Sequence, residues 1–424
     1  MSSDAPTQPN DKYLHWSNLR YRKPPEGLSS EDWWLAIKLA RLSARHVLPL
    51  VDKNGQPFAF TDSAYLNRML HRVDRDAGGR IELPADLVNA DSRDRYLVNS
   101  LIEEAITSSQ LEGAATTRRV AKEMLRSGRS PRDKSEQMIV NNYVGMEFLR
   151  GHTEAELSLP LLLELHRILT EDTLAPDEVG RIRRASEHVT VVDQRDGTVV
   201  HEPPDARALE ARLERLFAFA NARDEDPFVH PVLRAVLLHF MIGYEHPFVD
   251  GNGRIARALF YWAMVRSGYW MTEFLSISSI LRKAPAQYVR AYVFSEIDDN
   301  DVTYFLDYNL RVVLRSIRQL HDYLARKARE MRDIQRLLQG SRLASIFNYR
   351  QRALLAHLLR QPDAACTIKS HRRSHKVTYQ TARTDLLKLA ELGLVDGAKQ
   401  GRAFVFTDTG ELEERLQQLV TSDA

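Results

Sequence analysis

The chain has 424 residues, which exceeds one ordinary domain, so two to four domains are expected. Its 43% hydrophobic and 27% charged residues and net charge of +2 are typical of a soluble globular protein. No apolar stretch reaches ~18 residues, and the polar start, residues 1 to about 12, has no signal core, so no membrane partner is expected. A single cysteine, Cys366, excludes an internal disulfide and a multi-cysteine zinc site and fits a reducing cytoplasm.

The first part of the chain is expected to be partly disordered and then helical. Helical spacing of apolar residues predicts a helix over 32–47, capped by Ser30 or Asp32. The pair Asn54-Gly55 indicates a turn, and another helix is predicted over 63–75.

A mainly α-helical region follows. Two β-rich runs, 188–192 and 198–201, flank the turn-forming pair Asp196-Gly197 and are expected to pair as a hairpin. The predicted helices of this region span 91–110, 116–125, 135–148, 159–170, 205–222, 231–244 and 257–267, with one long helix or two reaching residue 338.

The stretch from His246 to Arg257 holds the densest set of chemically active residues. Residues 251–253 are turn formers that precede an apolar run, so backbone N–H groups at a helix start are expected to face an anion. Arg254 and Arg257 would share a helix face and offer guanidinium groups to phosphate oxygens. The stretch therefore predicts a phosphate site.

The same stretch also carries a metal ligand and a base. Asp250 offers a hard oxygen to Mg²⁺. His246 lies just outside the phosphate cradle, and its ordinary pKa near ~6.5 suits a general base. The alternative is a polar turn between two core helices, but the concentration of functional groups favours catalysis.

This stretch resembles the signature His-x-Phe-x-Asp/Glu-Gly-Asn-Gly-Arg-x-x-Arg of the Fic (Fic/Doc) family. The resemblance covers roughly residues 90–320 and implies an all-α Fic core with a β-hairpin flap that transfers AMP from ATP to a protein hydroxyl. It assigns His246 as base and Asp250 to the metal. Residues 251–254, including the Asn252 side chain, would hold the α- and β-phosphates, and Arg257 the γ-phosphate. The matching positions are His246, Phe248, Asp250, Gly251, Asn252, Gly253, Arg254 and Arg257.

The family resemblance extends to a short segment about 130 residues earlier. Many Fic proteins carry an inhibitory helix with the pattern Ser/Thr-x-x-x-Glu-Gly/Asn, which Ser108, Glu112 and Gly113 match. A carboxylate paired with Arg257 would withdraw the guanidinium from the γ-phosphate. The alternative is a surface glutamate beside a helix-ending glycine.

The resemblance also makes the predicted hairpin a flap over the nucleotide, with Val189 as a nucleotide contact. An exposed flap edge would accept the target segment as an added strand; an ordinary surface hairpin is the alternative. Tyr288 lies where the family often has a Tyr-Tyr pair beside the adenine, but the second position here is Val289.

The last part of the chain differs in charge. Residues 341–408 contain 12 Lys/Arg against 5 Asp/Glu. Helices over 348–359, 367–375 and 378–392 and strands over 393–396 and 402–407 resemble a winged helix-turn-helix. A protein-docking module is the alternative to DNA binding. The residues expected to contact DNA are Arg372, Arg373, Lys376, Tyr379 and Arg383.

The expected organisation is an N-terminal extension (1–89), a Fic domain with its inhibitory helix (90–338), a winged helix (341–410) and a tail (411–424). The expected function is AMPylation of a Ser, Thr or Tyr hydroxyl, on another protein or on the chain itself, inhibited by Glu112. Three alternatives stay open: removal of AMP, with Glu112 orienting a water; transfer of phosphate or phosphocholine; and a DNA-binding regulator whose Fic core only senses nucleotide. A homodimer also stays open.

Overall fold

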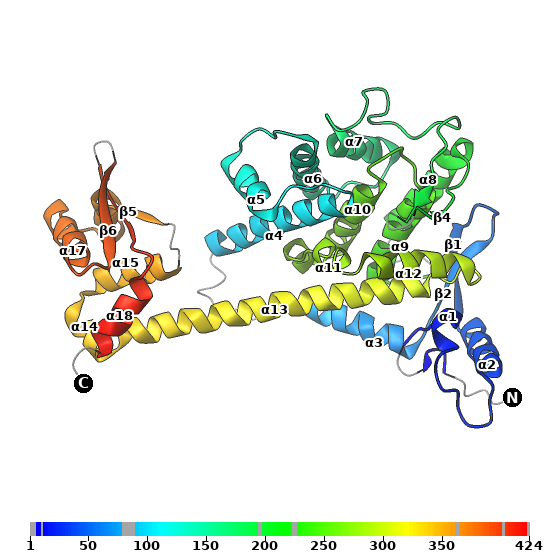
Figure 1. The fold of residues 1–424 in the computed structure, drawn as a ribbon, viewed down its shortest axis with the longest axis horizontal. Helices are drawn as coiled ribbons and strands as arrows, with labels where there is room; N and C mark the ends of the chain where they lie inside the picture. Colours follow the sequence, from blue (N-terminus) through cyan, green and yellow to red (C-terminus); the bar gives the residue numbers. More distant parts are fainter. Residues whose placement is uncertain are drawn as a thin grey trace. The chain divides into compact units, whose positions relative to one another are not determined.

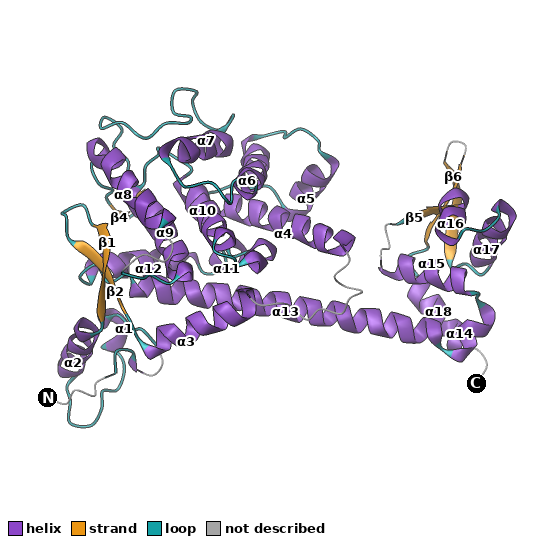
Figure 2. Cartoon of the chain, turned by 180° about the vertical axis from the view of Figure 1, so that it is seen from behind, coloured by secondary structure: helices purple, strands orange, loops and turns teal. Residues whose placement is uncertain are grey.

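The computed structural model describes residues 6–9, 12–78, 90–193, 197–222, 227–360, 364–400 and 403–421. These residues are mainly helical, as predicted, and their strands form small antiparallel sheets (Figures 1 and 2). The chain separates into two compact units, Met1–Leu320 and His321–Ala424. The boundary falls inside the long helix α13 (Thr303–Gln339).

The N-terminal part combines short helices with a hairpin that the sequence analysis missed. The helix predicted over 32–47 is α2 (Ser30–Ser43), and its cap is Ser29, which shares a capping box with Asp32. The prediction was wrong beyond Ser43, because alternate residues are buried from Leu48 onwards and Pro49 cannot continue a helix. The other elements are α1 (Trp16–Leu19), β1 (Arg45–Val51), β2 (Pro57–Thr61), α3 (Ala64–Val73) and the π-helical turn η2 (Asp74–Gly78).

The disorder expected for residues 1–12 falls largely outside the described residues. The described residue Thr7 accepts a hydrogen bond from Arg41 Nε through its carbonyl oxygen (2.9 Å). The turn predicted at Asn54-Gly55 is confirmed: Asp52 Oδ1 accepts from the Asn54 N–H (2.8 Å), and Gly55 has a φ of +80°. This turn joins β1 to β2.

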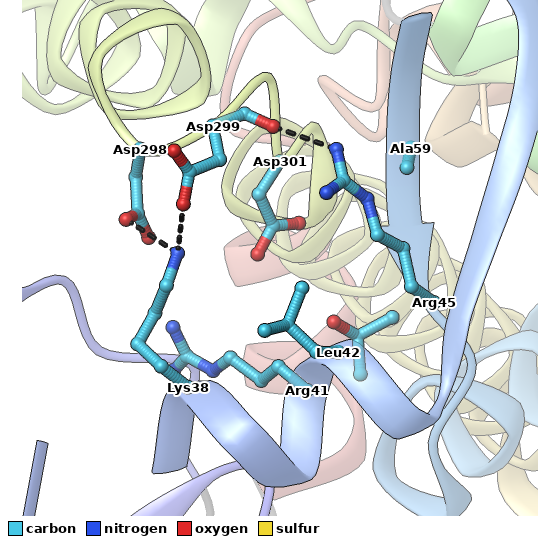
Figure 3. Close-up of a pocket in the computed structure, with 9 residues that line it drawn as sticks. Lys38, Arg41, Leu42, Arg45, Ala59, Asp298, Asp299 and Asp301 are labelled. Atoms are coloured by element: carbon cyan, nitrogen blue, oxygen red, sulfur yellow. Dashed lines mark hydrogen bonds and ion pairs between the residues drawn. The ribbon is translucent and has the colours of Figure 1, made fainter. Parts of the chain in front are cut away.

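Ion pairs fasten α2 to the connection between α12 (Pro285–Ile297) and α13 (Figure 3). Lys38 Nζ lies 2.7 Å from Asp298 and 2.8 Å from Asp299. Arg45 donates to the Asp299 carbonyl (2.8 Å), and Arg41 donates to the Tyr304 hydroxyl (2.7 Å). The charged groups around this small pocket are paired with one another or bonded to carbonyl and hydroxyl groups, so the pocket holds the structure together.

The middle of the first unit is built around α9 and α10, which pack along each other. Almost every residue of α9 is buried, because apolar side chains surround the helix on all sides. The predicted helices are confirmed, but α10 begins inside the motif rather than at Arg257. Bounds not yet given are α4 (Ala90–Leu111), α5 (Arg118–Ser127), α6 (Lys134–Arg150), α7 (Leu159–Thr170), η4 (Ala206–Ala208), α8 (Leu209–Asn221), α9 (Pro231–Glu245), α10 (Asn252–Arg266), η5 (Trp270–Phe274) and α11 (Ser278–Leu281).

The predicted hairpin is present, with shorter strands than expected. β3 (Val191–Val192) pairs antiparallel with β4 (Val199–His201). The turn closes through the Asp193 N–H, which donates to the Thr198 carbonyl (2.8 Å), and Gly197 has a φ of +74°. Asp196, the other predicted turn residue, lies outside the described residues.

The second unit contains the predicted helices and an antiparallel sheet in the order β5-β7-β6. The sequence analysis missed β5. It also assigned 411–424 to a tail, whereas α18 forms there because Leu412 and Leu416, four residues apart, are buried in the core of this unit. No helix in the described part of the chain is long and apolar enough to cross a membrane. The elements are α14 (Ser341–Ile346), α15 (Tyr349–Arg360), β5 (Ala365–Thr367), α16 (Ile368–His375), α17 (Tyr379–Glu391), β6 (Val395–Gln400), β7 (Ala403–Asp408) and α18 (Leu412–Thr421).

Candidate active site

The predicted motif forms a tight loop between α9 and α10. His246 ends α9 with a left-handed φ of 45°, and Gly251 precedes α10 with a φ of +88°. A Cβ atom at Gly251 would approach the Thr170 side chain to 3.1 Å, so glycine suits both the backbone conformation and the space. The first N–H groups of α10 therefore border this loop, as predicted.

Asn252 closes the loop through its side chain. Its Oδ1 accepts from the Phe248 N–H (3.0 Å), and its Nδ2 donates to the Phe248 carbonyl (2.8 Å). The side chain is buried, and both of its polar ends are used. In this geometry the side chain shapes the loop. The phosphate contact expected for it stays a prediction.

His166 on α7 packs against the loop and hydrogen-bonds to it, a role that the sequence analysis missed. Its ring stacks on Phe248 with centroids 3.9 Å apart. Its Nδ1 accepts from the Gly180 N–H (2.9 Å), so Nε2 carries the proton and donates to the Asp250 carbonyl (3.2 Å). Burial lowers the pKa of His166 to about 4, which keeps this arrangement neutral.

Arg183 fixes the backbone of the candidate base. Its Nε donates to the His246 carbonyl (2.8 Å), and its backbone N–H donates to the Pro247 carbonyl (2.8 Å). Its Nη2 donates to the Pro204 carbonyl (2.5 Å). This arginine therefore links the loop to the segment that follows the flap.

The His246 ring is oriented for proton transfer. Its Nδ1 lies 3.2 Å from the Gly243 carbonyl, which can only accept, so Nδ1 carries the proton and Nε2 keeps its lone pair. Burial is the main cause that lowers the pKa of His246 to about 4. The ring is therefore neutral at pH 7 and able to accept a proton.

Arg254 is a buried cation whose hydrogen bonds are incomplete. Its side chain is 0% exposed, and Nη1 donates to the Leu169 carbonyl (2.6 Å). Nε and Nη2 have no hydrogen-bond partner among the described residues, and Nη2 lies 3.6 Å from Asp250 Oδ2. Because an incompletely paired buried charge is costly, this guanidinium is well suited to an anionic ligand.

Ser108 and Glu112, two residues of the segment expected to be inhibitory, bond to Arg257. Arg257 Nη2 donates to Glu112 Oε1 (2.8 Å) and to the Ser108 carbonyl (3.0 Å), and its Nε donates to Ser108 Oγ (2.9 Å). A Cβ atom at Gly253 would lie 2.1 Å from Glu112 Oε1, so this carboxylate rests directly on the first turn of α10. Gly113 turns the chain after α4 with a φ of +94°. The structure thus brings together residues 145 positions apart in the sequence.

Residues 156–264, which include this loop, match the family model described as the Fic/DOC family. The chain carries a Fic/DOC domain. The chain is 31% identical over 135 residues to the protein adenylyltransferase Fic of Drosophila grimshawi and 33% identical to that of Drosophila melanogaster. Each match covers 30% of this chain and only about a quarter (26% and 25%) of the relative.

Solved structures share the fold. A Fic family protein from Desulfovibrio desulfuricans matches 82% of this chain and 98% of its own, with a TM-score of 0.54 and 16% identity. Fic-1 from C. elegans matches 72% of this chain and 79% of its own, with a TM-score of 0.51 and 18% identity. At these identities the likeness concerns the all-α fold.

Asp250 is the residue expected to bind the metal. Asp250 Oδ1 accepts from the Gly251 N–H (2.6 Å), and the side chain is 43% exposed. The described residues contain no group of three His, Cys, Asp or Glu side chains suited to a metal. The hard carboxylate fits Mg²⁺ only if phosphate oxygens and water complete the coordination.

Tyr288, expected beside the adenine, and Val189, expected to contact the nucleotide, lie apart from the phosphate loop in sequence. Tyr288 on α12 is half-buried, and its hydroxyl lies 2.7 Å from His239 Nε2 and 3.4 Å from the Tyr292 hydroxyl. Val189 is half-buried in the extended segment before β3. The residues expected at DNA, Arg372, Arg373, Lys376, Tyr379 and Arg383, are exposed on α16, α17 and their connection in the second unit.

Proposed function

We propose that this chain is a protein adenylyltransferase that transfers AMP from ATP to a Ser, Thr or Tyr hydroxyl of a protein. One observation carries the proposal: a neutral His246 and the incompletely bonded, buried Arg254 belong to the same loop–helix junction. The likeness of residues 156–264 to Fic/DOC domains, including two in proteins named protein adenylyltransferase, supports it.

In the proposed reaction, the target hydroxyl attacks the α-phosphate of ATP while His246 Nε2 takes its proton. A bond forms between the hydroxyl oxygen and the α-phosphorus, and the bond from that phosphorus to pyrophosphate breaks. Arg254 and the first N–H groups of α10 stabilise the phosphate oxygens. Asp250 would hold Mg²⁺, which supplies charge neutralisation on the leaving pyrophosphate.

We propose further that Glu112 inhibits the transfer of AMP. The Glu112 carboxylate forms an ion pair with the Arg257 guanidinium, which would otherwise bind the γ-phosphate. ATP held without that contact would present its α-phosphate out of line with the hydroxyl, and misplacement by ~1 Å can cost about 10²-fold in rate. Incubation with ATP, Mg²⁺ and candidate targets, followed by mass spectrometry of adenylated hydroxyls, tests the function.

Removal of AMP from a modified target is the second candidate for the same site. Only Oε1 of Glu112 bonds to Arg257, and the side chain is 26% exposed, so Oε2 has room to orient a water molecule. A protein already carrying AMP distinguishes the two directions. Loss of AMP that depends on Glu112 would assign the chain to removal, and stable AMP would leave transfer as its activity.

The pH dependence of catalysis should reflect the buried base. Because burial lowers the pKa of His246 to about 4, the kcat/KM of an uninhibited variant should stay level from pH 8 to about pH 5 and fall only near pH 4. A fall centred near ~6.5, the ordinary histidine pKa, would contradict this assignment.

Stability must be followed in the same pH series. The pKa values of His166 and His246 are lowered to about 4 and that of His239 to about 3, mainly by burial. The unfolded chain therefore binds more protons than the folded chain below ~6.5, and the free energy of unfolding should decrease as the pH falls from ~6.5 towards 4. The melting temperature at each pH separates this loss from the titration of the base.

We also infer that the second unit binds double-stranded DNA through α16, the start of α17 and their connection. Arg372, Arg373, Lys376 and Arg383 are exposed, and within the described residues none of them is in an ion pair. Helices α16 and α17 contain two carboxylates. Glu391 is the last residue of α17, and Asp385 is buried. It is held by Arg350 Nε (2.7 Å) and His371 Nε2 (3.2 Å). The exposed face is therefore basic and suits a phosphate backbone.

Replacing Arg372, Arg373 and Lys376 together with alanine should weaken DNA binding and flatten its salt dependence. Each lost phosphate contact lowers the logarithmic salt slope by ~0.9. Titration of the full chain with labelled duplex DNA at several salt concentrations measures both effects. A variant with Arg326, Arg329 and Arg332 of α13 replaced removes the same charge elsewhere and should bind normally. If the full chain shows no DNA affinity at low salt, protein docking is the better interpretation.

A further inference from the structure

A third carboxylate lies on the face of α4 that reaches Arg257. Glu104, Ser108 and Glu112 are spaced four residues apart, so they line one side of the helix and its C-terminal extension. Glu104 is 2% exposed and belongs to no motif identified in the sequence. Burial raises its pKa, and the nearby Arg257 charge opposes that rise. The function proposed above gives this residue no role.

Glu104 is bonded to the segment 274–278, which precedes and opens α11. Its carboxylate accepts from Ser276 Oγ (2.9 Å), from the Ser278 N–H (3.2 Å) and from Ser278 Oγ. One turn away on either side, Ser100 Oγ donates to the Phe274 carbonyl (3.2 Å) and Thr107 Oγ1 lies 3.2 Å from Ser276 Oγ. α4 is thus pinned along this segment.

The same segment is bonded to α10, the helix that carries Arg257. The Tyr261 hydroxyl donates to the Leu275 carbonyl (3.2 Å) and accepts from the Ile277 N–H (2.8 Å). Segment 274–278 therefore connects α4 to α10 through polar contacts on both sides. A rotation or slide of α4 would leave the buried Glu104 carboxylate without its donors, which is costly.

We propose that Glu104 is a positioning residue that holds α4 in register with α10, so that Glu112 meets Arg257. The inference rests on the proposed inhibition by Glu112. Glu112 lies just beyond the end of α4, about 12 Å along the axis from Glu104 at ~1.5 Å per residue. Because Glu112 sits on a turn, the position of its carboxylate follows the position of the helix. Glu104 acts on the inhibited state through Glu112 and not on the reacting atoms.

Alanine at Glu104 should therefore release part of the inhibition. We expect Glu104→Ala to raise AMP incorporation about tenfold, less than Glu112→Gly, which corresponds to a coupling of ~1.4 kcal/mol. Glu104→Gln should stay near wild type, because its amide oxygen can still accept from the Ser278 N–H and from Ser276 Oγ, and its amide N–H can donate to the Ser278 hydroxyl. Glu103→Ala is the matched control: Glu103 pairs with Arg118 and Lys122 on α5, and its loss should leave incorporation unchanged.

The decisive comparison uses the double variant. If Glu104 acts through Glu112, Glu104→Ala should add nothing in the Glu112→Gly background, whereas a merely structural effect would shift activity in both backgrounds. Wild-type incorporation by Glu104→Ala, or an equal rise in both backgrounds, would overturn the inference. Should Glu104→Ala fail to fold, Ser278→Ala removes one hydrogen-bond donor to Glu104 and should give a smaller rise in AMP incorporation. If Ser278→Ala gave no rise, that result would count equally against a positioning role for Glu104. Failure of Glu112→Gly itself to activate would instead refute the proposed inhibition.

Discussion

Replacing His246 with alanine should lower AMP transfer by ~10²–10⁴-fold, the usual contribution of a general base. In the proposed reaction the ring Nε2 takes the hydroxyl proton, whereas Arg254 and the N–H groups of α10 would bind the phosphates. ATP affinity should therefore change by only a few-fold. Label incorporation and ATP binding by calorimetry, both measured in the Glu112→Gly background, separate the two quantities.

A matched control removes a histidine that has no proposed role in catalysis. His152, exposed just after α6, bonds to the Phe148 carbonyl (2.7 Å). His152→Ala should transfer AMP at the rate of its parent. Near-normal transfer by the His246 variant on the same acceptor would remove this residue from the role of base.

Replacing Glu112 with glycine should raise auto-AMPylation by up to about 10²-fold, the factor that a misplacement of ~1 Å can cost. The substitution frees Arg257, whose Nη2 would then be available to the γ-phosphate. Arg257→Ala also breaks the pair but removes the phosphate contact, so it should not activate the enzyme. Incorporation of label into the purified chain measures the effect.

A purely structural role for Glu112 predicts a different pair of results. Loss of a packing residue would leave incorporation unchanged and lower the melting temperature, with glycine costing up to ~1 kcal/mol in a helix. Because Glu112 lies just after α4, even that cost should be small. Unchanged incorporation would contradict the proposed inhibition. Glu112 would then have either a structural role or a role in AMP removal.

The loop of the Fic domain could be predicted because its chemistry is local. Small residues at 251–253 followed by an apolar run indicate a loop that opens a helix, and the structure places that junction at Gly251. The pairing of Glu112 with Arg257 was expected from the family resemblance alone. Nothing in the spacing of residues so far apart fixes their contact.

The supporting residues could not be found from the sequence. His166, Arg183 and Glu104 lie in ordinary helical or irregular segments, and their roles arise from contacts with residues distant in the chain. The first residues of β1 were assigned to the preceding helix because apolar residues of α2 run directly into β1, which hides the change of period. The amphipathic pattern of α18 is short, so it did not predict a helix in the segment that was assigned to a tail.

The identity of the transferred group tests the central claim most directly. The Glu112→Gly variant should be incubated with Mg²⁺ and ATP labelled either at the α-phosphate or at the γ-phosphate, and the protein then separated from free nucleotide. The proposed reaction predicts covalent label from the α-position only, and its loss when His246 is also replaced. Label from the γ-position would show phosphate transfer, and absence of label from both positions, in a folded variant that binds ATP, would contradict adenylyl transfer.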